Sequence, residues 1–147
     1  MTTTTATPAA RTTTRRVGLA RGAALGTAGS VLANAAVFAL ATRNDPLRVV
    51  TGWQPDGTDL ALGAVLGTSI AFVLLAAAVL WGLERLRADG FRLWAILAGA
   101  VATLSIAPLF GLDVDNRSKL ALAAMHLVVG GSAIGGQAIA RHEVSGC

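Results

Sequence analysis

The chain has 147 residues, of which 54% are hydrophobic and only 14% are charged, with a formal net charge of +4. A soluble domain carries about 25% charged residues, so this composition excludes an ordinary soluble globular protein. A single cysteine excludes an intrachain disulfide, and the absence of a basic stripe with interleaved aromatic residues argues against a nucleic-acid partner.

Four long stretches carry no charged side chain, namely Gly22–Ala41, Leu60–Leu83, Leu93–Leu112 and Leu120–Ala140. A hydrocarbon core about 30 Å thick needs about 20 apolar residues at a rise of about 1.5 Å each, and every stretch reaches that length. We therefore predict an all-α fold, an integral membrane bundle of four antiparallel transmembrane helices. Residues 17–141 form this domain, with helices over about 20–41, 60–83, 93–112 and 120–140.

The N-terminal segment, residues 1–16, is rich in threonine and contains almost no large apolar side chain. Such a segment cannot bury a core, so we predict a disordered cytoplasmic tail there and a short cytoplasmic tail over 142–147. Thr14–Leu19 resembles a twin-arginine export signal. The apolar stretch after it is longer than the 7–15 residues of a usual signal core, which favours a retained helix over a cleaved signal.

The basic residues indicate the orientation of the helices, because cytoplasmic flanks carry an excess of Lys and Arg. Eight lie on the side of both termini: Arg11, Arg15, Arg16, Arg21, Arg85, Arg87, Arg92 and Arg141. Four lie on the other side: Arg43, Arg48, Arg117 and Lys119. We therefore expect a multi-pass plasma-membrane protein with cytoplasmic termini, and Trp81 and Trp94 at the headgroup level beside the cytoplasmic loop.

Small residues recur at four-residue spacing on three of the predicted helices. Lipid removes the hydrophobic drive for helix association, so close packing of backbones across GxxxG-like stripes must replace it. We favour packing inside the bundle over packing between two copies of the chain. The residues predicted to pack are Gly22, Gly26, Ser30, Gly63, Gly67, Gly131 and Gly135.

His126 is the only ionisable residue inside a predicted span. It lies about 9 Å, and Asn34 about 10 Å, below the same end of the bundle at 1.5 Å per residue. Polar residues of the two other helices fall in the same half, and Pro108 can kink the third span toward this layer. We expect a buried hydrogen-bonded cluster of Asn34, Ser105 and His126, with Thr68 or Ser69 nearby.

Two interpretations of this cluster remain open. In the structural one, which we favour, interhelical polar contacts worth about 0.6 kcal/mol each fix the register of the helices. In the functional one, His126 responds to protons or contacts a ligand, because imidazole titrates near physiological pH. We predict no catalytic residue, no metal site and no cofactor, since no phosphate loop, metal-ligand cluster or pair of intramembrane histidines for a haem is present.

Several short motifs follow one another at characteristic intervals: Ala33–Ala35, Trp81–Arg85, a third helix starting near Trp94, Leu104–Pro108 and Met125–Val129. Their order and spacing resemble an actinobacterial family of uncharacterised four-helix membrane proteins, classed as a domain of unknown function. The resemblance covers about Val17 to Arg141. It implies a four-helix membrane domain and no established activity, substrate or cofactor.

The function favoured by these observations is a non-enzymatic membrane subunit or accessory protein. Its partners are the lipid bilayer and either another protein or a second copy of the chain. The alternative is a small transporter or channel component with a polar site around His126, and a membrane-embedded enzyme is the third interpretation. A water-filled cavity that reaches His126 from the outer face favours transport, whereas a dry, fully packed layer favours a structural role.

Overall fold

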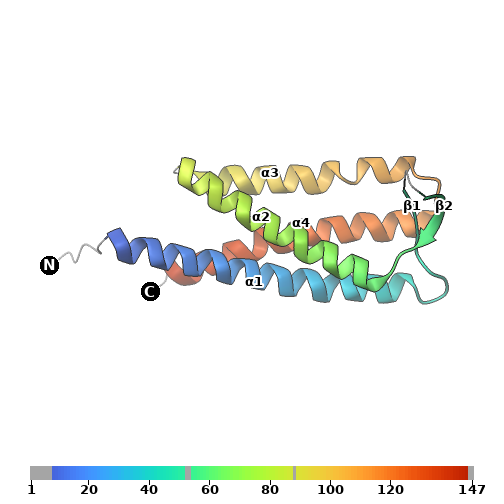
Figure 1. Ribbon diagram of the computed structural model, residues 1–147, viewed down its shortest axis with the longest axis horizontal. Coiled ribbons are helices and arrows are strands. Elements are labelled where there is room, and N and C mark those ends of the chain that lie inside the picture. Colours follow the sequence, from blue (N-terminus) through green and yellow to red (C-terminus); the bar gives the residue numbers. More distant parts are fainter. Residues whose placement is uncertain (1–7, 52–53, 88, 146–147) are drawn as a thin grey trace.

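The computed structural model describes residues 8–51, 54–87 and 89–145, and these residues form a bundle of four antiparallel helices (Figure 1). The helices are α1 (Pro8–Ala41), α2 (Leu62–Leu86), α3 (Gly90–Leu104) and α4 (Asn116–Ser145). A 3-10 helix, η1 (Ala107–Gly111), follows α3. An antiparallel hairpin of β1 (Arg48–Thr51) and β2 (Gln54–Asp59) joins α1 to α2. The predicted all-α fold is confirmed.

Four helical segments are long and apolar enough to cross a membrane: Val17–Ala41, Leu62–Leu86, Gly90–Gly111 and Asn116–Glu143. In their most hydrophobic windows at most 22% of the residues are buried inside the protein, and only 6% in the third segment. Most of the apolar side chains therefore point outward. An outward apolar surface of this extent is stable in lipid and unfavourable in water.

The two ends of the bundle differ. The N-terminus of α1, the C-terminus of α4 and the connection between α2 and α3 lie together at one end, called here the terminal end (Figure 1). The hairpin and the connection from η1 to α4 lie at the opposite end, called here the hairpin end (Figure 1). Both termini therefore lie at the same end of the bundle.

The helices extend further than the charge pattern predicted. α1 begins at Pro8, so the prediction of a disordered segment is wrong for residues 8–16, and residues 1–7 lie outside the described residues. Proline is well suited to the first position of a helix, and each residue added to an existing helix costs little. α4 likewise continues to Ser145 rather than ending near residue 140.

Helices α1 and α4 pack together more extensively than any other pair. A Cβ atom added to Gly136 would lie 2.5 Å from the Gly22 oxygen and 2.5 Å from the Gly26 nitrogen. One added to Gly26 would lie 2.8 Å from the Ser132 oxygen. Ser30 continues the same stripe and is fully buried. Gly22 and Gly26 thus lie where the backbones of α1 and α4 come close together, and Ser30 is buried on the same stripe of α1.

The other predicted packing glycines do not contact a neighbouring helix. No atom lies within 4 Å of a Cβ added to Gly63, Gly67, Gly131 or Gly135. The buried residues of α2 include Val65 and Ser69, which are two positions beyond Gly63 and Gly67 and thus about 200° away around the helix. On α4 the adjacent Gly130 and Gly136 make the close contacts instead. The predicted glycines of α2 and α4 therefore lie on helix faces that do not touch a neighbouring helix.

The hairpin covers one end of the bundle. Leu47, just before β1, is fully buried and packs with Val65, Ala121 and Met125. The Arg48 amide donates to the Ser118 hydroxyl at 3.3 Å, and Arg117 donates to the Asp45 and Pro46 carbonyl oxygens. These contacts bind the hairpin to the first turn of α4, so the connection between α1 and α2 is part of the folded bundle.

Asp115 caps the N-terminus of α4. Its carboxylate accepts the Ser118 amide at 2.9 Å and the Ser118 hydroxyl at 2.7 Å. The hydrogen bond from the Ser118 hydroxyl, followed by that from the Ser118 amide, lowers the pKa of Asp115 below its ordinary value. The capping carboxylate also suits the positive end of the helix dipole.

We expect the Asp115→Asn variant to melt at a lower temperature than the wild type at neutral pH. Because the folded pKa is lowered, the carboxylate stabilises the protein above the unfolded pKa of about 3.9, and this contribution is lost as the pH falls through the folded value. The difference in melting temperature between the wild type and Asp115→Asn, measured in detergent, should therefore become smaller below about pH 4. Asp113→Asn, at an exposed carboxylate nearby, is the control, and an equal effect of both substitutions would contradict the capping role.

At the terminal end, Trp94 of α3 is 2% exposed and donates from Nε1 to the Ala76 carbonyl of α2 at 2.8 Å. The ring of Trp94 therefore fills the space where α2 and α3 meet and does not lie on the outward surface of the bundle. Its predicted place at the headgroup level stays a prediction. Trp81 is 43% exposed and its ring stacks with the Arg85 guanidinium at 3.7 Å. Arg141 of α4 pairs with Glu84, which ties α4 to the end of α2.

Candidate functional site

A groove of about 490 Å³ runs between α2 and α3, and residues of α4 form its floor. The two helices are held together at the terminal end by Trp94 and diverge toward the hairpin end (Figure 1). α3 ends at Leu104, and η1 begins just before Pro108, whose ring cannot continue an α-helix. Such a volume lies within the range of about 300–1,000 Å³ typical of small-molecule sites.

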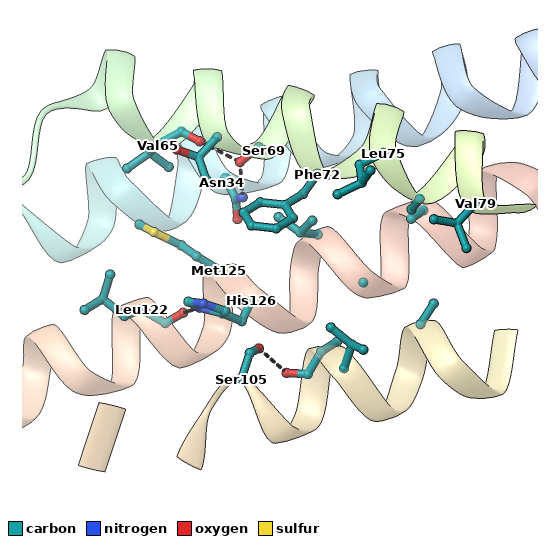
Figure 2. Close-up of a pocket in the computed structure, with 18 of the residues that line it drawn as sticks. Asn34, Val65, Ser69, Phe72, Leu75, Val79, Ser105, Leu122, Met125 and His126 are labelled. Atoms are coloured by element: carbon teal, nitrogen blue, oxygen red, sulfur yellow. Dashed lines mark hydrogen bonds between the residues drawn. The ribbon is translucent and has the colours of Figure 1, made fainter. Parts of the chain in front are cut away.

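All five residues of the predicted polar cluster line this groove (Figure 2). They come from all four helices: Asn34 from α1, Thr68 and Ser69 from α2, Ser105 from the turn after α3, and His126 from α4. Each faces the half of the groove nearer the hairpin end. The polar side chains predicted to share one layer thus line one groove, and no sequence pattern predicted the groove itself.

Asn34 and Ser69 form one hydrogen-bonded pair between α1 and α2. The Asn34 amide Nδ2 donates to the Ser69 hydroxyl at 2.7 Å, and that hydroxyl donates to the Val65 carbonyl at 2.7 Å. Both polar side chains are at most 2% exposed. Asn34 Oδ1 has no hydrogen-bond partner among the described residues. The buried contact expected for Asn34 is present, with Ser69 rather than with His126.

His126 and Ser105 bond to their own backbone segments instead of to each other. His126 Nδ1 lies 2.7 Å from the Leu122 carbonyl oxygen, one helical turn back. The Ser105 hydroxyl donates to the Ala102 carbonyl at 2.8 Å. The expectation of one hydrogen-bonded cluster of Asn34, Ser105 and His126 is therefore wrong. In an apolar environment a short polar side chain takes the nearest carbonyl of its own helix, which requires no second helix to approach.

The rest of the groove is apolar, and none of its lining residues is Asp, Glu, Lys or Arg. Phe72, Leu75 and Val79 of α2 face Leu97 and Val101 of α3 across it. No sequence pattern distinguishes these residues, because apolar side chains on a membrane helix face lipid and cavities alike. Within the described residues, no three His, Cys, Asp or Glu side chains gather in a way that would hold a metal ion.

The polar end of the groove is separated from the hairpin end by packed apolar side chains. Leu60, Val65 and Met125 line the groove and also pack in the cluster around the fully buried Leu47. The groove therefore opens along the side of the bundle, between α2 and α3, rather than through the hairpin end. In a membrane this side faces lipid.

The fold and the groove define a small multi-pass helical membrane protein with a side-opening intramembrane cavity. The chain belongs to the family of unknown function DUF6069, whose profile matches residues 13–142. Neither a curated protein nor a solved structure shows a significant match to the chain. The family covers all four helices, in agreement with the resemblance noted in the sequence, and assigns no activity to the groove.

Proposed function

We propose that this chain is a non-enzymatic accessory protein of a bacterial plasma membrane that holds a membrane-soluble small molecule in the groove between α2 and α3. The observation that carries the proposal is the groove of about 490 Å³, which is apolar along its length and polar at one end. A purely structural bundle gains stability by filling such a space, since unfilled volume forfeits packing contacts.

Several features support this function over transport of a water-soluble substrate. The lining contains no charged residue, and apolar side chains around Leu47 separate His126 from the hairpin end. A hydrated or charged substrate would lose its water in such a groove without compensation. The distribution of eight basic residues at the terminal end and four at the hairpin end supports cytoplasmic termini, with the polar end of the groove in the outer half of the membrane.

The test is native mass spectrometry of the protein purified gently from its own membranes. We expect the wild type to retain an adduct of lipid-like mass. Val101→Trp should lose it, because Val101 lines the groove and, being 66% exposed, leaves room for an indole ring to occupy the space. Leu32→Trp, at a residue 72% exposed on α1 and outside the groove, should retain it.

A wild-type protein without an adduct, or equal retention by the two tryptophan variants, would contradict binding in the groove. The same spectra test the expectation of a protein partner or a second copy. A stoichiometric partner protein supports an accessory subunit, and a doubled mass supports a homo-oligomer.

A further inference from the structure

One buried acceptor at the polar end of the groove has no donor. Ser69 has a single hydroxyl proton, which it donates to the Val65 carbonyl, so Asn34 must turn its Nδ2 and not its oxygen toward Ser69. The hydrogen-bond network thus fixes the orientation of the amide. Asn34 Oδ1 points away from Ser69, toward the side of the groove where Phe72 and Met125 lie (Figure 2), and no described residue donates to it.

A second acceptor lies on the facing helix. The Leu122 carbonyl can only accept, so His126 Nδ1, 2.7 Å away, carries the proton of the neutral imidazole. Nε2 is then an acceptor, and no described residue donates to it. Because Asn34 and His126 line the same groove, its polar end presents two acceptors that require donors from a bound molecule.

The groove is long and mostly apolar. From Ala64 to Val79 its α2 wall is about 22 Å long at 1.5 Å per residue. Apolar side chains line this length, and the polar side chains gather toward one end. This arrangement fits an amphiphile whose hydrocarbon chain lies along the groove and whose polar group lies at the polar end.

The absence of charged lining residues restricts the polar headgroup of a bound molecule. Phosphate, carboxylate or ammonium groups would be buried without an opposite charge, because no lining residue is Asp, Glu, Lys or Arg. A quinone or an ester is neutral but supplies acceptors only, and so leaves Asn34 Oδ1 and His126 Nε2 without donors. A hydroxyl is neutral and donates a proton.

We infer that the groove holds a neutral amphiphile whose hydroxyl groups donate to Asn34 Oδ1 and His126 Nε2. Its hydrocarbon chain lies along Phe72, Leu75 and Leu97 and ends near Trp94 at the terminal end. This assignment rests on the proposed function of the groove. Long-chain alcohols and monoacylglycerols share the required chemistry, the first with one donor and the second with two.

The test compares ligands of equal chain length on the full-length protein in detergent, by titrating the shift of its melting temperature. The probes are 1-monooleoylglycerol, oleyl alcohol, methyl oleate, which lacks a donor, and oleate, which is charged. We expect 1-monooleoylglycerol to bind about tenfold more tightly than methyl oleate, or more, because it can donate two hydrogen bonds and each is worth about 1 kcal/mol. If oleyl alcohol binds as tightly as 1-monooleoylglycerol, only one of the two acceptors receives a hydrogen bond. If oleyl alcohol binds more weakly, both acceptors do.

Variants locate the hydroxyl. Asn34→Ala and His126→Phe should each reduce the preference for 1-monooleoylglycerol over methyl oleate, and His126→Phe keeps the test decisive if Asn34→Ala does not fold. Thr103→Val is the control, because Thr103 is exposed, donates to the Gly99 carbonyl and does not line the groove. It should leave the preference unchanged.

The outcomes distinguish an incorrect headgroup from the absence of any binding in the groove. Equal affinity for 1-monooleoylglycerol and methyl oleate, with both lost in Val101→Trp, would overturn the hydroxyl headgroup and leave the groove occupied by another amphiphile. Tightest binding of oleate would also overturn it. No binding of any probe, or binding unaffected by Val101→Trp, would overturn the proposed function as well.

Discussion

Gly136→Ala is expected to lower the free energy of unfolding by about 1–3 kcal/mol, the usual cost of overpacking a tightly packed site. The added Cβ would lie 2.5 Å from two backbone atoms of α1, the Gly22 oxygen and the Gly26 nitrogen. Backbone atoms cannot rotate away as a side chain does, so the backbones of α1 and α4 must move apart at this contact. Thermal unfolding in detergent, followed by circular dichroism, measures the effect.

The neighbouring Gly135→Ala provides a matched control. No atom lies within 4 Å of its added Cβ, and alanine is favoured over glycine inside a helix by about 1 kcal/mol. This variant should therefore be as stable as the wild type or slightly more stable. Equal destabilisation by the two substitutions would contradict a specific role of the contact between α1 and α4, because helix propensity alone would stabilise both variants.

Trp94→Ala is expected to destabilise the protein by about 3 kcal/mol, at the lower end of the range for removing a large buried aromatic side chain. Trp94 is the largest fully buried side chain among the described residues and belongs to a core cluster with Val73, Leu80 and Ala133. In lipid the loss comes from packing contacts and the cavity left behind, because the hydrophobic transfer term between helices is small. Chemical or thermal unfolding in detergent measures it.

Two comparisons separate the contributions of Trp94. Trp94→Phe keeps an aromatic ring and loses the hydrogen bond to the Ala76 carbonyl, so we expect its free energy of unfolding to fall by about 1 kcal/mol. Trp81→Ala removes a ring that is 43% exposed, and a smaller loss than for Trp94→Ala is expected. Equal losses for Trp81→Ala and Trp94→Ala would contradict the role of Trp94 as the contact that holds α2 against α3.

The contact made by Trp94 also determines the shape of the groove. α2 and α3 meet at this side chain and at the short connection beside it, where a Cβ on Gly90 would lie 2.8 Å from the Glu84 backbone. Toward the hairpin end they diverge, and their facing apolar side chains do not fill the space between them. A membrane protein of four helices thus acquires a cavity that opens to lipid and is polar at one depth.

The membrane-spanning segments, and the group of polar residues that line one groove, were predictable from the amino-acid sequence alone. The thickness of a bilayer fixes the length of an uncharged span, and the constant rise of a helix converts residue number into depth. Asn34, Thr68, Ser69, Ser105 and His126 therefore fall in one predicted layer, and all five line the groove. The stripe of Gly22, Gly26 and Ser30 was equally predictable, because a four-residue spacing places small residues on one face.

Which of these residues contact one another depends on long-range packing and could not be predicted from local patterns. The glycines of α2 and α4 differ in contact because a shift of one residue turns a side chain by about 100°, and the sequence does not state how each helix is rotated in the bundle. The same limit applies to Trp94, which is buried although its position suited the membrane surface. The groove depends on the angle between α2 and α3, and that angle follows from long-range packing that no local pattern encodes.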